Sequence, residues 1–464
     1  MSKRVRVVKK GGKVAAPEGR GVSKARAAAF EILRRVEEEG AYAAPLLAGA
    51  AERLSTEDRS LCYELVLGVL RRQLWLDKLA EHFAGRGADE LDAPVRRALR
   101  LGLYQLRFTS RVPARAAVNE SVNLVHASRV RHAAPFANAV LRRATREPDF
   151  DPAADIKDPL ERVAVSTSHP TWLVARWAES FGAEWAEAFA RANNDAAPAS
   201  FRVNTLREGE EKVLERLREA GVAASPSRVA PGGWRAEGGA GAGRLLRELA
   251  AGGLIYMQDE ASQLVAHVLG AREGERVLDV CAAPGGKTTH AAALAGDRAL
   301  IVAGDLHEGR LRLVRESCER LGVESVTAVA LNAEAGLPFA DATFDRVLLD
   351  APCTGTGTLR HNPEIRWRLT PERAAELPPV QRRILSESAR GVRPGGRLVY
   401  STCSVEREEN EDVLAAFLHE RSDFRQVPAA PAPDALLLPS GAARTWPHRD
   451  DVDGFFVAAL RRRD

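Results

Sequence analysis

Two cysteines in this sequence each follow an apolar run and could act as nucleophiles. Cys353 ends a run that begins at Leu348, and Cys403 ends a run that begins at Leu398. A cysteine side chain can attack a substrate and form a covalent intermediate, which divides one difficult step into two easier ones. Free cysteines are more often buried structural thiols, but two thiols that follow strand-like runs in one chain favour a chemical role.

A third segment, upstream of both cysteines, predicts a cofactor pocket. Residues 277–280 form an apolar strand, and a helix is expected to begin near Lys287. The turn between them consists of Cys281, Ala282, Ala283, Pro284, Gly285 and Gly286. Such a turn offers backbone N–H groups to a ligand at the helix N-terminus. A Walker A loop would need glycine at position 281, and the dinucleotide fingerprint G-x-G-x-x-G is absent, so neither motif describes this segment.

Polar side chains stand at the ends of the predicted strands from residue 258 onward. In this region strands and helices alternate in the manner of a doubly wound sheet. The residues at or just past strand ends are Asp279, Asp305, Asn332, Asp350 and Cys403. Ligands of such folds bind beyond the carboxyl ends of the strands. The sequence therefore predicts one cleft that collects these side chains.

The three segments, in this order, resemble motifs of the Sun/RsmB family of RNA cytosine-C5 methyltransferases, which use S-adenosylmethionine (SAM). The resemblance extends to residues 361–367 and 454–458. Residues 117–124 and 136–143 resemble the NusB-like N-terminal domain carried by the bacterial RsmB branch of the family. Together these similarities cover residues 22–462.

The resemblance implies an all-α NusB-like N-terminal domain, then a small α/β RNA-binding insert, then an α/β Rossmann-like SAM-dependent methyltransferase domain. Helical spacing of apolar residues and a Pro/Asp-rich linker agree with this division. The predicted boundaries are a basic disordered arm over 1–21, the helical domain over 22–146, the linker over 147–159, the insert over 160–257 and the catalytic domain over 258–464.

Arginines interrupt the apolar pattern of the helical segment and could form a surface that faces RNA phosphates. They are Arg71, Arg72, Arg96, Arg97, Arg100, Arg107, Arg111, Arg115, Arg129, Arg131, Arg142, Arg143 and Arg146. A solvated helix face has the same composition, so the residues alone leave both interpretations open. The NusB resemblance favours RNA binding.

For the cofactor, the resemblance implies that the turn from Cys281 to Gly286 approaches the amino-acid end of SAM and that Lys287 belongs to the same site. A solvated helix residue is the alternative for Lys287. Asp305 would accept hydrogen bonds from the ribose diol. Asn332 stands on the adenine side, where the family usually has an acidic residue. Its amide oxygen can still accept a hydrogen bond, but the charge is lost, which puts the cofactor affinity in doubt.

For the chemistry, the resemblance implies that a thiolate adds to C6 of cytosine and makes C5 nucleophilic. The related RNA enzymes use the cysteine of the Thr-Cys-Ser segment, here Cys403, and assign product release to the Pro-Cys thiol, here Cys353. DNA cytosine methyltransferases use the Pro-Cys thiol as the nucleophile, which would select Cys353 instead. Asp350 is expected to contact both the cofactor site and the N3/N4 edge of the base. This mechanism requires no metal.

Composition sets limits on the remaining possibilities. The chain has 464 residues, enough for several domains, and a net charge of only +4. Its five cysteines contain no C-x-x-C pair, which fits neither a disulfide framework nor a zinc site. No membrane span or signal peptide is evident, so we expect a cytoplasmic protein.

The sequence thus predicts a 16S ribosomal RNA (cytosine-C5)-methyltransferase that acts as a monomer, with small-subunit ribosomal RNA as its partner. The choice of RNA comes from the family branch alone. Two alternatives stay open: the same chemistry on transfer RNA, and a catalytically silent RNA-binding protein. Intact Cys353, Cys403, Asp305 and Asp350 argue against the silent protein.

Overall fold

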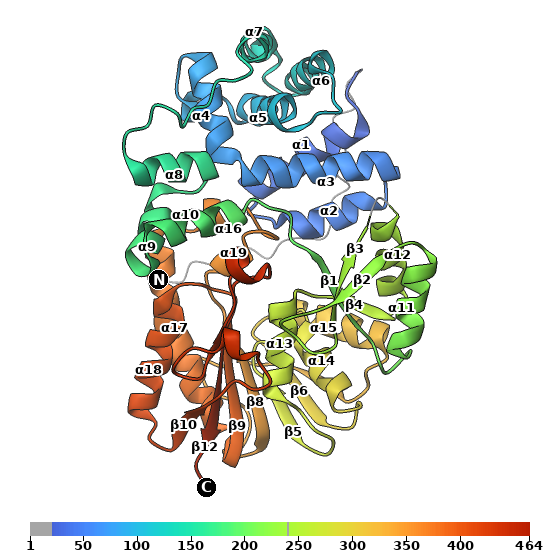
Figure 1. Cartoon of the computed structure of the whole chain (residues 1–464), viewed down its shortest axis with the longest axis vertical. Helices are drawn as coiled ribbons and strands as arrows, with labels where there is room; N and C mark the ends of the chain where they lie inside the picture. Colours follow the sequence, from blue (N-terminus) through green and yellow to red (C-terminus); the bar gives the residue numbers. More distant parts are fainter. Residues whose placement is uncertain (1–20, 239–240) are drawn as a thin grey trace. The chain divides into compact units, whose positions relative to one another are not determined.

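The computed structural model describes residues 21–238 and 241–464 (Figure 1). The predicted basic arm, apart from Gly21, lies outside the described residues. The chain divides into two compact units. The first extends to Trp177 and also includes Asn362–Glu364, while the second contains the remaining residues from Ala178 to the C-terminus.

The first unit is helical, as the apolar spacing predicts. Its helices are α1 (Lys24–Glu38), α2 (Ala43–Ala51), α3 (Thr56–Arg71), α4 (Gln73–Ala84), α5 (Ala93–Phe108), α6 (Ala114–His126), α7 (Ala134–Arg146), α8 (Pro159–Thr167) and most of α9 (Thr171–Phe181). The Ser55 hydroxyl accepts a hydrogen bond from the Asp58 N–H and caps α3. Helix α5 is central, with Leu99 and Leu103 fully buried. Within the described residues no helix is both long and apolar enough to cross a membrane.

Two of the arginines considered for RNA binding are buried instead. Arg97 is 1% exposed and pairs with Glu37 at 2.7 Å. Arg100 is 4% exposed, and its guanidinium forms ion pairs with Glu37 and with Asp77, both at 2.6 Å. The expectation that these two face phosphates is wrong, because α5 lies in the core and its cations are neutralised by carboxylates of α1 and α4.

The second unit begins with α10 (Ala183–Ala192) and a four-stranded antiparallel sheet. Its strands are β1 (Ala199–Val203), β2 (Ala223–Pro226), β3 (Gly233–Glu237) and β4 (Ile255–Met257), in the order β2-β3-β1-β4. Helices α11 (Glu210–Glu219) and α12 (Ala242–Ala251) connect them. The sequence indicates β1 and β4 but not the β2-β3 hairpin, whose strands are poor in large apolar residues.

The larger sheet of this unit positions the candidate site. Its order is β10-β12-β9-β8-β5-β6-β7, and β11 pairs with β12. The strands are β5 (Arg276–Asp279), β6 (Leu300–Asp305), β7 (Val326–Ala330), β8 (Phe344–Asp350), β9 (Val392–Thr402), β10 (Phe424–Val427), β11 (Ala443–Arg444) and β12 (Phe456–Arg462). From β9 to β7 neighbouring strands are parallel, while β12 and β10 are antiparallel additions. Strands β5 and β8, at the switch point of the order, are adjacent, so a ligand crevice is expected at their carboxyl ends.

Helices cover this sheet and connect its parallel strands (Figure 1). They are α13 (Glu260–Leu269), α14 (Gly286–Leu294), α15 (Glu308–Leu321), α17 (Pro371–Arg390) and α18 (Glu411–Glu420). The short helices α16 (Ile365–Arg368) and α19 (Pro447–Asp450) belong to the same unit, and α19 packs against α10. The apolar runs from which the strands are predicted form the core, where Leu278, Leu348 and Val399 are fully buried. The doubly wound arrangement predicted from residue 258 onward is confirmed.

Candidate active site

The two cysteines predicted to carry the chemistry lie side by side. Asp350, at the end of β8, pairs with Ser401 in β9. Cys353 lies three residues after the end of β8, and Cys403 directly follows Thr402, the last residue of β9. Because the strands are parallel neighbours, both loops leave the same edge of the sheet, and the two Sγ atoms are 3.5 Å apart. The contact with Cys403, together with burial, raises the pKa of Cys353 well above its ordinary value. The surroundings of Cys353 therefore favour its protonated form.

A third loop closes around the cysteines through backbone contacts. The Gly357 N–H donates to the Cys403 carbonyl at 2.9 Å, and the Gly454 N–H donates to the Gly357 carbonyl at 2.8 Å. A Cβ atom at Gly357 would stand 1.9 Å from the Gly454 carbonyl oxygen, so only glycine fits there. The segments after β8 and β9 and the one before β12 consequently form one packed unit.

The turn after β5 has the predicted strand-turn-helix form. Gly285 has φ +104°, a conformation that side chains disfavour, and it caps the start of α14. A Cβ at Gly286 would lie 3.1 Å from the Tyr256 ring. The Ala283–Pro284 peptide is cis. Close backbone packing, rather than a phosphate cradle, thus explains the glycines of this turn.

This turn lines a cavity of about 200 Å³. Its lining includes seven of the predicted site residues: Cys281, Ala282, Ala283, Pro284, Gly286, Lys287 and Asp350. Tyr256, Met257, Gln258, Ser262 and Asp279 complete it. Neither Cys353 nor Cys403 is part of the lining, but Asp350, three residues before Cys353, is.

Each carboxylate oxygen of Asp350 accepts a hydrogen bond, so the orientation of the side chain is fixed. The Ser401 hydroxyl donates to Oδ1 at 2.7 Å, and the Lys287 ammonium donates to Oδ2 at 2.7 Å. Burial opposes the charged form of Lys287, yet the ion pair with Asp350 outweighs it and raises the pKa of the ammonium group. The Lys287 side chain is only 14% exposed, so the alternative that it is a solvated helix residue is wrong.

Asp279 supplies a carboxylate that the sequence placed at a strand end but did not assign to the cofactor. It is 2% exposed, and the Thr288 hydroxyl donates to its Oδ2 at 2.6 Å. Its Oδ1 is buried in the cavity wall without a hydrogen-bond partner of normal geometry. Burial raises the pKa of Asp279 to about 7, although the hydrogen bond from Thr288 favours the charged form. An unsatisfied buried acceptor of this kind fits a ligand that donates hydrogen bonds.

Three predicted cofactor residues do not line the cavity. Gly285 packs against α15, where its Cβ would meet the Val314 backbone at 3.2 Å. Asp305 is 3% exposed; its Oδ1 accepts from the His307 N–H at 3.0 Å, and its Oδ2 lies 3.4 Å from the Arg310 guanidinium. Asn332 is exposed, and its amide oxygen accepts from the Glu334 N–H.

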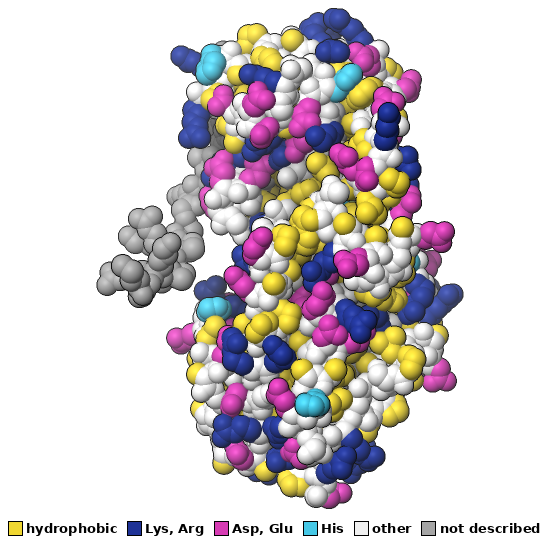
Figure 2. Space-filling view, turned by 90° about the vertical axis from the view of Figure 1, so that its left-hand side faces the viewer, with side chains coloured by type: hydrophobic (Ala, Val, Ile, Leu, Met, Phe, Trp, Pro, Cys, Tyr) yellow, Lys and Arg dark blue, Asp and Glu magenta, His cyan; other side chains and the backbone are white. Residues whose placement is uncertain are grey.

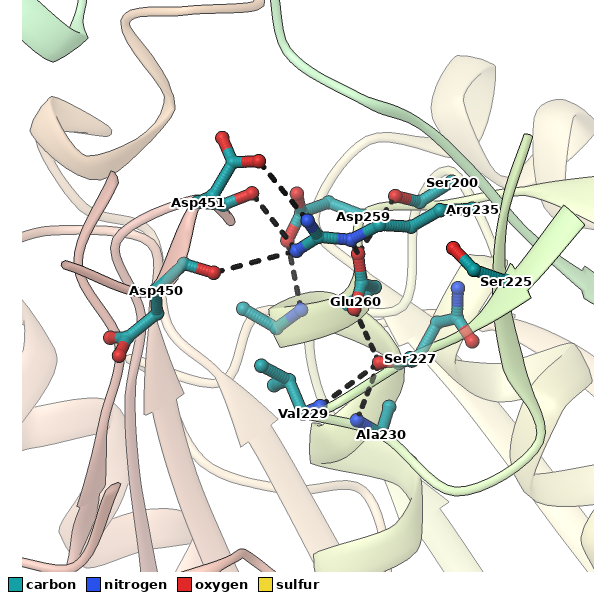
Figure 3. A network of polar contacts seen from close by, with 12 residues as sticks. Ser200, Ser225, Ser227, Val229, Ala230, Arg235, Asp259, Glu260, Asp450 and Asp451 are labelled. Atoms are coloured by element: carbon teal, nitrogen blue, oxygen red, sulfur yellow. Dashed lines mark hydrogen bonds and ion pairs between the residues drawn. The ribbon is translucent and has the colours of Figure 1, made fainter. Parts of the chain in front are cut away.

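The sequence predicts a strand over 254–257 but no site residue in the segment 256–262, and a polar network around the buried Glu260 holds this segment in place (Figure 3). Glu260, fully buried, accepts hydrogen bonds from the Ser200 and Ser227 hydroxyls and forms an ion pair with Arg235. The Arg235 guanidinium also forms an ion pair with the Asp451 carboxylate at 3.1 Å. The network joins β1 and β3 to the start of α13 and to the loop before β12. A carboxylate-rich helix start, Asp259-Glu260, is the only sequence signal for it.

Comparisons with known proteins agree with this geometry. Residues 266–461 match the family described as 16S rRNA methyltransferase RsmB/F. Residues 23–146 match the NusB family, and residues 169–239 match the ferredoxin-like domain of RsmF/B-like methyltransferases. The predicted combination of a NusB-like domain, an α/β insert and a methyltransferase domain is confirmed.

Similar proteins extend over nearly the whole chain. The chain is 35% identical to the probable ribosomal RNA small subunit methyltransferase B of Bacillus subtilis, over 94% of this chain and 98% of that protein. It is 36% identical to the protein of the same description from Synechocystis, over 94% and 99%. The crystal structure of PH0851 is 29% identical, with a TM-score of 0.82 over 96% of this chain and all of that one. A methyltransferase homologue from Pyrococcus horikoshii is 30% identical, with a TM-score of 0.56 over 66% and 100%. The chain therefore belongs to the RsmB/F family of SAM-dependent 16S rRNA methyltransferases.

Proposed function

We propose that this protein methylates C5 of a cytidine in small-subunit ribosomal RNA through a covalent bond between Cys403 and C6 of the base. The observation that carries the proposal is the pair of thiols 3.5 Å apart, beside a carboxylate that reaches the cofactor cavity. Addition of a thiolate to C6 places electron density on C5, which then becomes the methyl acceptor. Only one of two adjacent thiols can form this bond, so the other is available for proton transfer.

The protonation of Cys353 indicates which role each thiol has in the reaction. The raised pKa of Cys353 favours its protonated form, which supports Cys403, 3.5 Å away, as the attacking sulfur. Once Cys403 is a neutral thioether, the contact that raises the pKa of Cys353 is weakened. Cys353 can then give its proton to solvent water and, as a thiolate, accept the proton of C5. The electrons of the C5–H bond re-form the C5–C6 double bond while the bond between C6 and Cys403 breaks, which releases the Cys403 thiolate.

Asp350 is proposed to contact the amidine edge of the base. Ser401 and Lys287 hold its carboxylate in one orientation, and each oxygen keeps a second lone pair for the base. A carboxylate at N3 stabilises the cationic character that develops when a nucleophile adds to C6. The Lys287 ammonium, which forms an ion pair with Asp350, also lies 5.1 Å from the centre of the Phe455 ring.

The cavity residues are proposed to hold SAM, whose sulfonium supplies the methyl group when it is bound. The free Oδ1 of Asp279 fits the donor-rich, positively charged amino-acid end, next to the turn from Cys281 to Gly286. Asp305 is assigned to the ribose diol and Asn332 to the adenine side, as the family resemblance implies. Both residues then exchange their present contacts, to His307 and Glu334, for contacts with the ligand.

We expect SAM to bind more tightly as the pH rises through the pKa of Asp279. The pKa is raised to about 7, so the carboxylate is largely neutral at pH 6 and mostly charged at pH 7.5. A charged partner for the SAM ammonium group therefore forms over this range, and the affinity should increase several-fold, by about one decade per pH unit at most. Calorimetric titration at fixed ionic strength measures this, below the pH of about 8 where the amino group itself deprotonates.

The matched control is Asp279→Asn, which preserves the shape of the side chain and its contact with Thr288. This variant should bind SAM weakly and with little dependence on pH. If it keeps the pH dependence of the original protein, the titrating group is elsewhere and Asp279 does not contact the ammonium.

The helical domain is proposed to bind RNA through its exposed arginines. Those at the surface of α6, α7 and the adjoining loops are Arg111, Arg115, Arg129, Arg131, Arg142, Arg143 and Arg146. Figure 2 shows dark blue Lys and Arg side chains at the top of the view, on the helical unit. Contacts of this kind position a substrate through its phosphates and carry no sequence information directly.

Replacing Arg111, Arg115, Arg129 and Arg131 with glutamine should weaken RNA binding and flatten its salt dependence. Each lost phosphate contact lowers the slope of log K against log salt by about 0.7 to 0.9. Filter binding across a salt series measures the slope, and SAM affinity should stay unchanged. Arg34→Gln is the control, because its guanidinium already pairs with Glu31 at 2.6 Å. An unchanged slope in the quadruple variant would identify these arginines as a solvated face.

We propose that the protein is a monomer, that it acts in the cytoplasm and that its domains have the boundaries predicted from the sequence.

The reaction and the RNA are tested together by mapping 5-methylcytosine in cells with and without this protein. One cytidine of the small-subunit ribosomal RNA should lose its methyl group in the deletion strain and regain it on complementation. Loss confined to transfer RNA would replace the substrate, and no loss in any RNA would overturn the proposed activity.

A further inference from the structure

A buried carboxylate connects the two loops that carry the cysteines. Glu409 lies at the end of η4 (Arg407–Glu409), after β9, and is 1% exposed. It accepts hydrogen bonds from Thr354, the residue after Cys353, and from Ser404, the residue after Cys403. One side chain thus contacts the immediate neighbours of both thiols.

The two oxygens of Glu409 have different kinds of donors. Oε2 accepts from the Thr354 backbone N–H and from the Gln381 amide, both at 2.9 Å. Oε1 accepts from the Thr354 hydroxyl at 2.5 Å and from the Ser404 hydroxyl at 2.8 Å. N–H groups can only donate, whereas hydroxyls can also accept. A glutamine in this place can therefore keep all four contacts by placing its amide nitrogen at the hydroxyls.

Further contacts extend the same network to the cysteine loops. Gln381 also donates to the Pro352 carbonyl at 2.9 Å, directly before Cys353. The Thr354 and Ser404 hydroxyls are 3.0 Å apart. The Tyr400 hydroxyl donates to the Glu409 carbonyl at 2.5 Å and fixes the backbone from the side of β9. The loops after β8 and β9 are therefore held to each other through Glu409 and not only through the sheet.

Within the described part of the chain, hydrogen-bond donors rather than a cation surround the Glu409 carboxylate. Among the described residues, no Lys or Arg nitrogen lies within 4.0 Å of it, and burial raises its pKa. A buried carboxylate without a cation is tolerated only where hydrogen bonds replace its hydration. Here the donors come from the segments around the reactive thiols, so the geometry of those segments depends on Glu409.

We infer that Glu409 is a positioning residue that holds the Cys353 and Cys403 thiols at the separation at which Cys403 can add to C6 and Cys353 can accept the C5 proton. It contacts neither substrate nor cofactor in this role. The inference deepens the proposed function and rests on it for the chemistry, but the spacing of the thiols can be measured without any methyl transfer.

The test compares Glu409→Ala with Glu409→Gln by the rate at which Cys353 and Cys403 become linked. A dipyridyl disulfide reacts with one thiol and releases a thiopyridone, and the second thiol then attacks the mixed disulfide and releases another. Peptide mass spectrometry identifies the linked pair. Glu411→Ala is the control, since Glu411 is a nearby carboxylate that pairs with Arg444 at 2.8 Å and contacts neither thiol loop.

We expect the linking step to slow at least about tenfold in Glu409→Ala and to stay within about twofold of the original rate in Glu409→Gln and Glu411→Ala. Misplacing reacting groups by 1 Å can cost about 100-fold, so kcat should fall on that scale in Glu409→Ala, with the KM for RNA and the SAM affinity unchanged. Linking at the original rate in Glu409→Ala would overturn the inference. If Glu409→Ala does not fold, Ser404→Ala removes one donor and should slow linking by a smaller factor; no slowing there would also overturn it.

Failure of the proposed function gives a different pattern. If cytosine C5 is not the target, no variant changes 5-methylcytosine, while the order of linking rates still reports on Glu409. If Glu409 has only a structural role, melting temperature and SAM affinity fall together with linking in Glu409→Ala.

Discussion

Cys403→Ala should lose methyl transfer almost completely, by roughly 10⁴-fold or more, the scale on which enzymes lose activity with their nucleophile. The loss follows from the chemistry, because C5 of cytosine does not accept a methyl group until a nucleophile has added to C6. Cys353, 3.5 Å away, does not replace it, since it holds its proton and follows a different strand. Transfer of radiolabelled methyl groups to the substrate RNA measures the effect.

The matched control is Cys318→Ala, which removes a thiol of the same domain that is 8% exposed on α15. It should retain activity, and both variants should bind SAM as the original protein does. Residual activity of a few per cent in Cys403→Ala would mean that the essential nucleophile is another group.

Cys353→Ala should stop the reaction at a later stage. We expect steady-state turnover to fall by roughly 10²- to 10⁴-fold, the usual contribution of a positioned acid or base. Adduct formation should continue, because Cys403 keeps its place after β9. Covalent complexes of the protein with RNA that contains no fluorinated base should therefore accumulate. They should migrate slowly in a denaturing gel.

The double variant Cys353→Ala/Cys403→Ala separates this result from nonspecific crosslinking. It should form no slow-migrating species under the same conditions. If Cys353→Ala is inactive and also forms no adduct, Cys353 acts before elimination and the proposed order of the two thiols is incorrect.

Much of this arrangement is predictable from the sequence, because the parallel sheet dictates it. The short, mostly apolar runs at residues 277–280, 344–349 and 396–401, separated by helical segments, favour buried parallel strands, and parallel strands end at one edge of the sheet. The side-by-side position of Cys353 and Cys403, and the approach of Asp350 to the turn from Cys281, follow directly from that rule.

Other features depend on contacts between distant segments that no local pattern encodes. The burial of Arg97 and Arg100 requires knowledge of which helices pack beside α5. Glu409 resembles any charged residue of the run 406–409, although it is the acceptor for both cysteine loops. The contribution of Tyr256 and Gln258 to the cavity depends on how the small sheet docks on α13 and α14.

The central claim, a covalent bond between Cys403 and C6, is tested most directly with RNA that carries 5-fluorocytidine. After methyl transfer the fluorine cannot leave as a proton, so elimination fails and the enzyme stays attached to the RNA. We predict that mass spectrometry of the digested complex finds the nucleotide on the peptide that contains Cys403. A nucleotide attached to the peptide of Cys353, or full methyl transfer to normal RNA with no adduct on fluorinated RNA, would contradict the account.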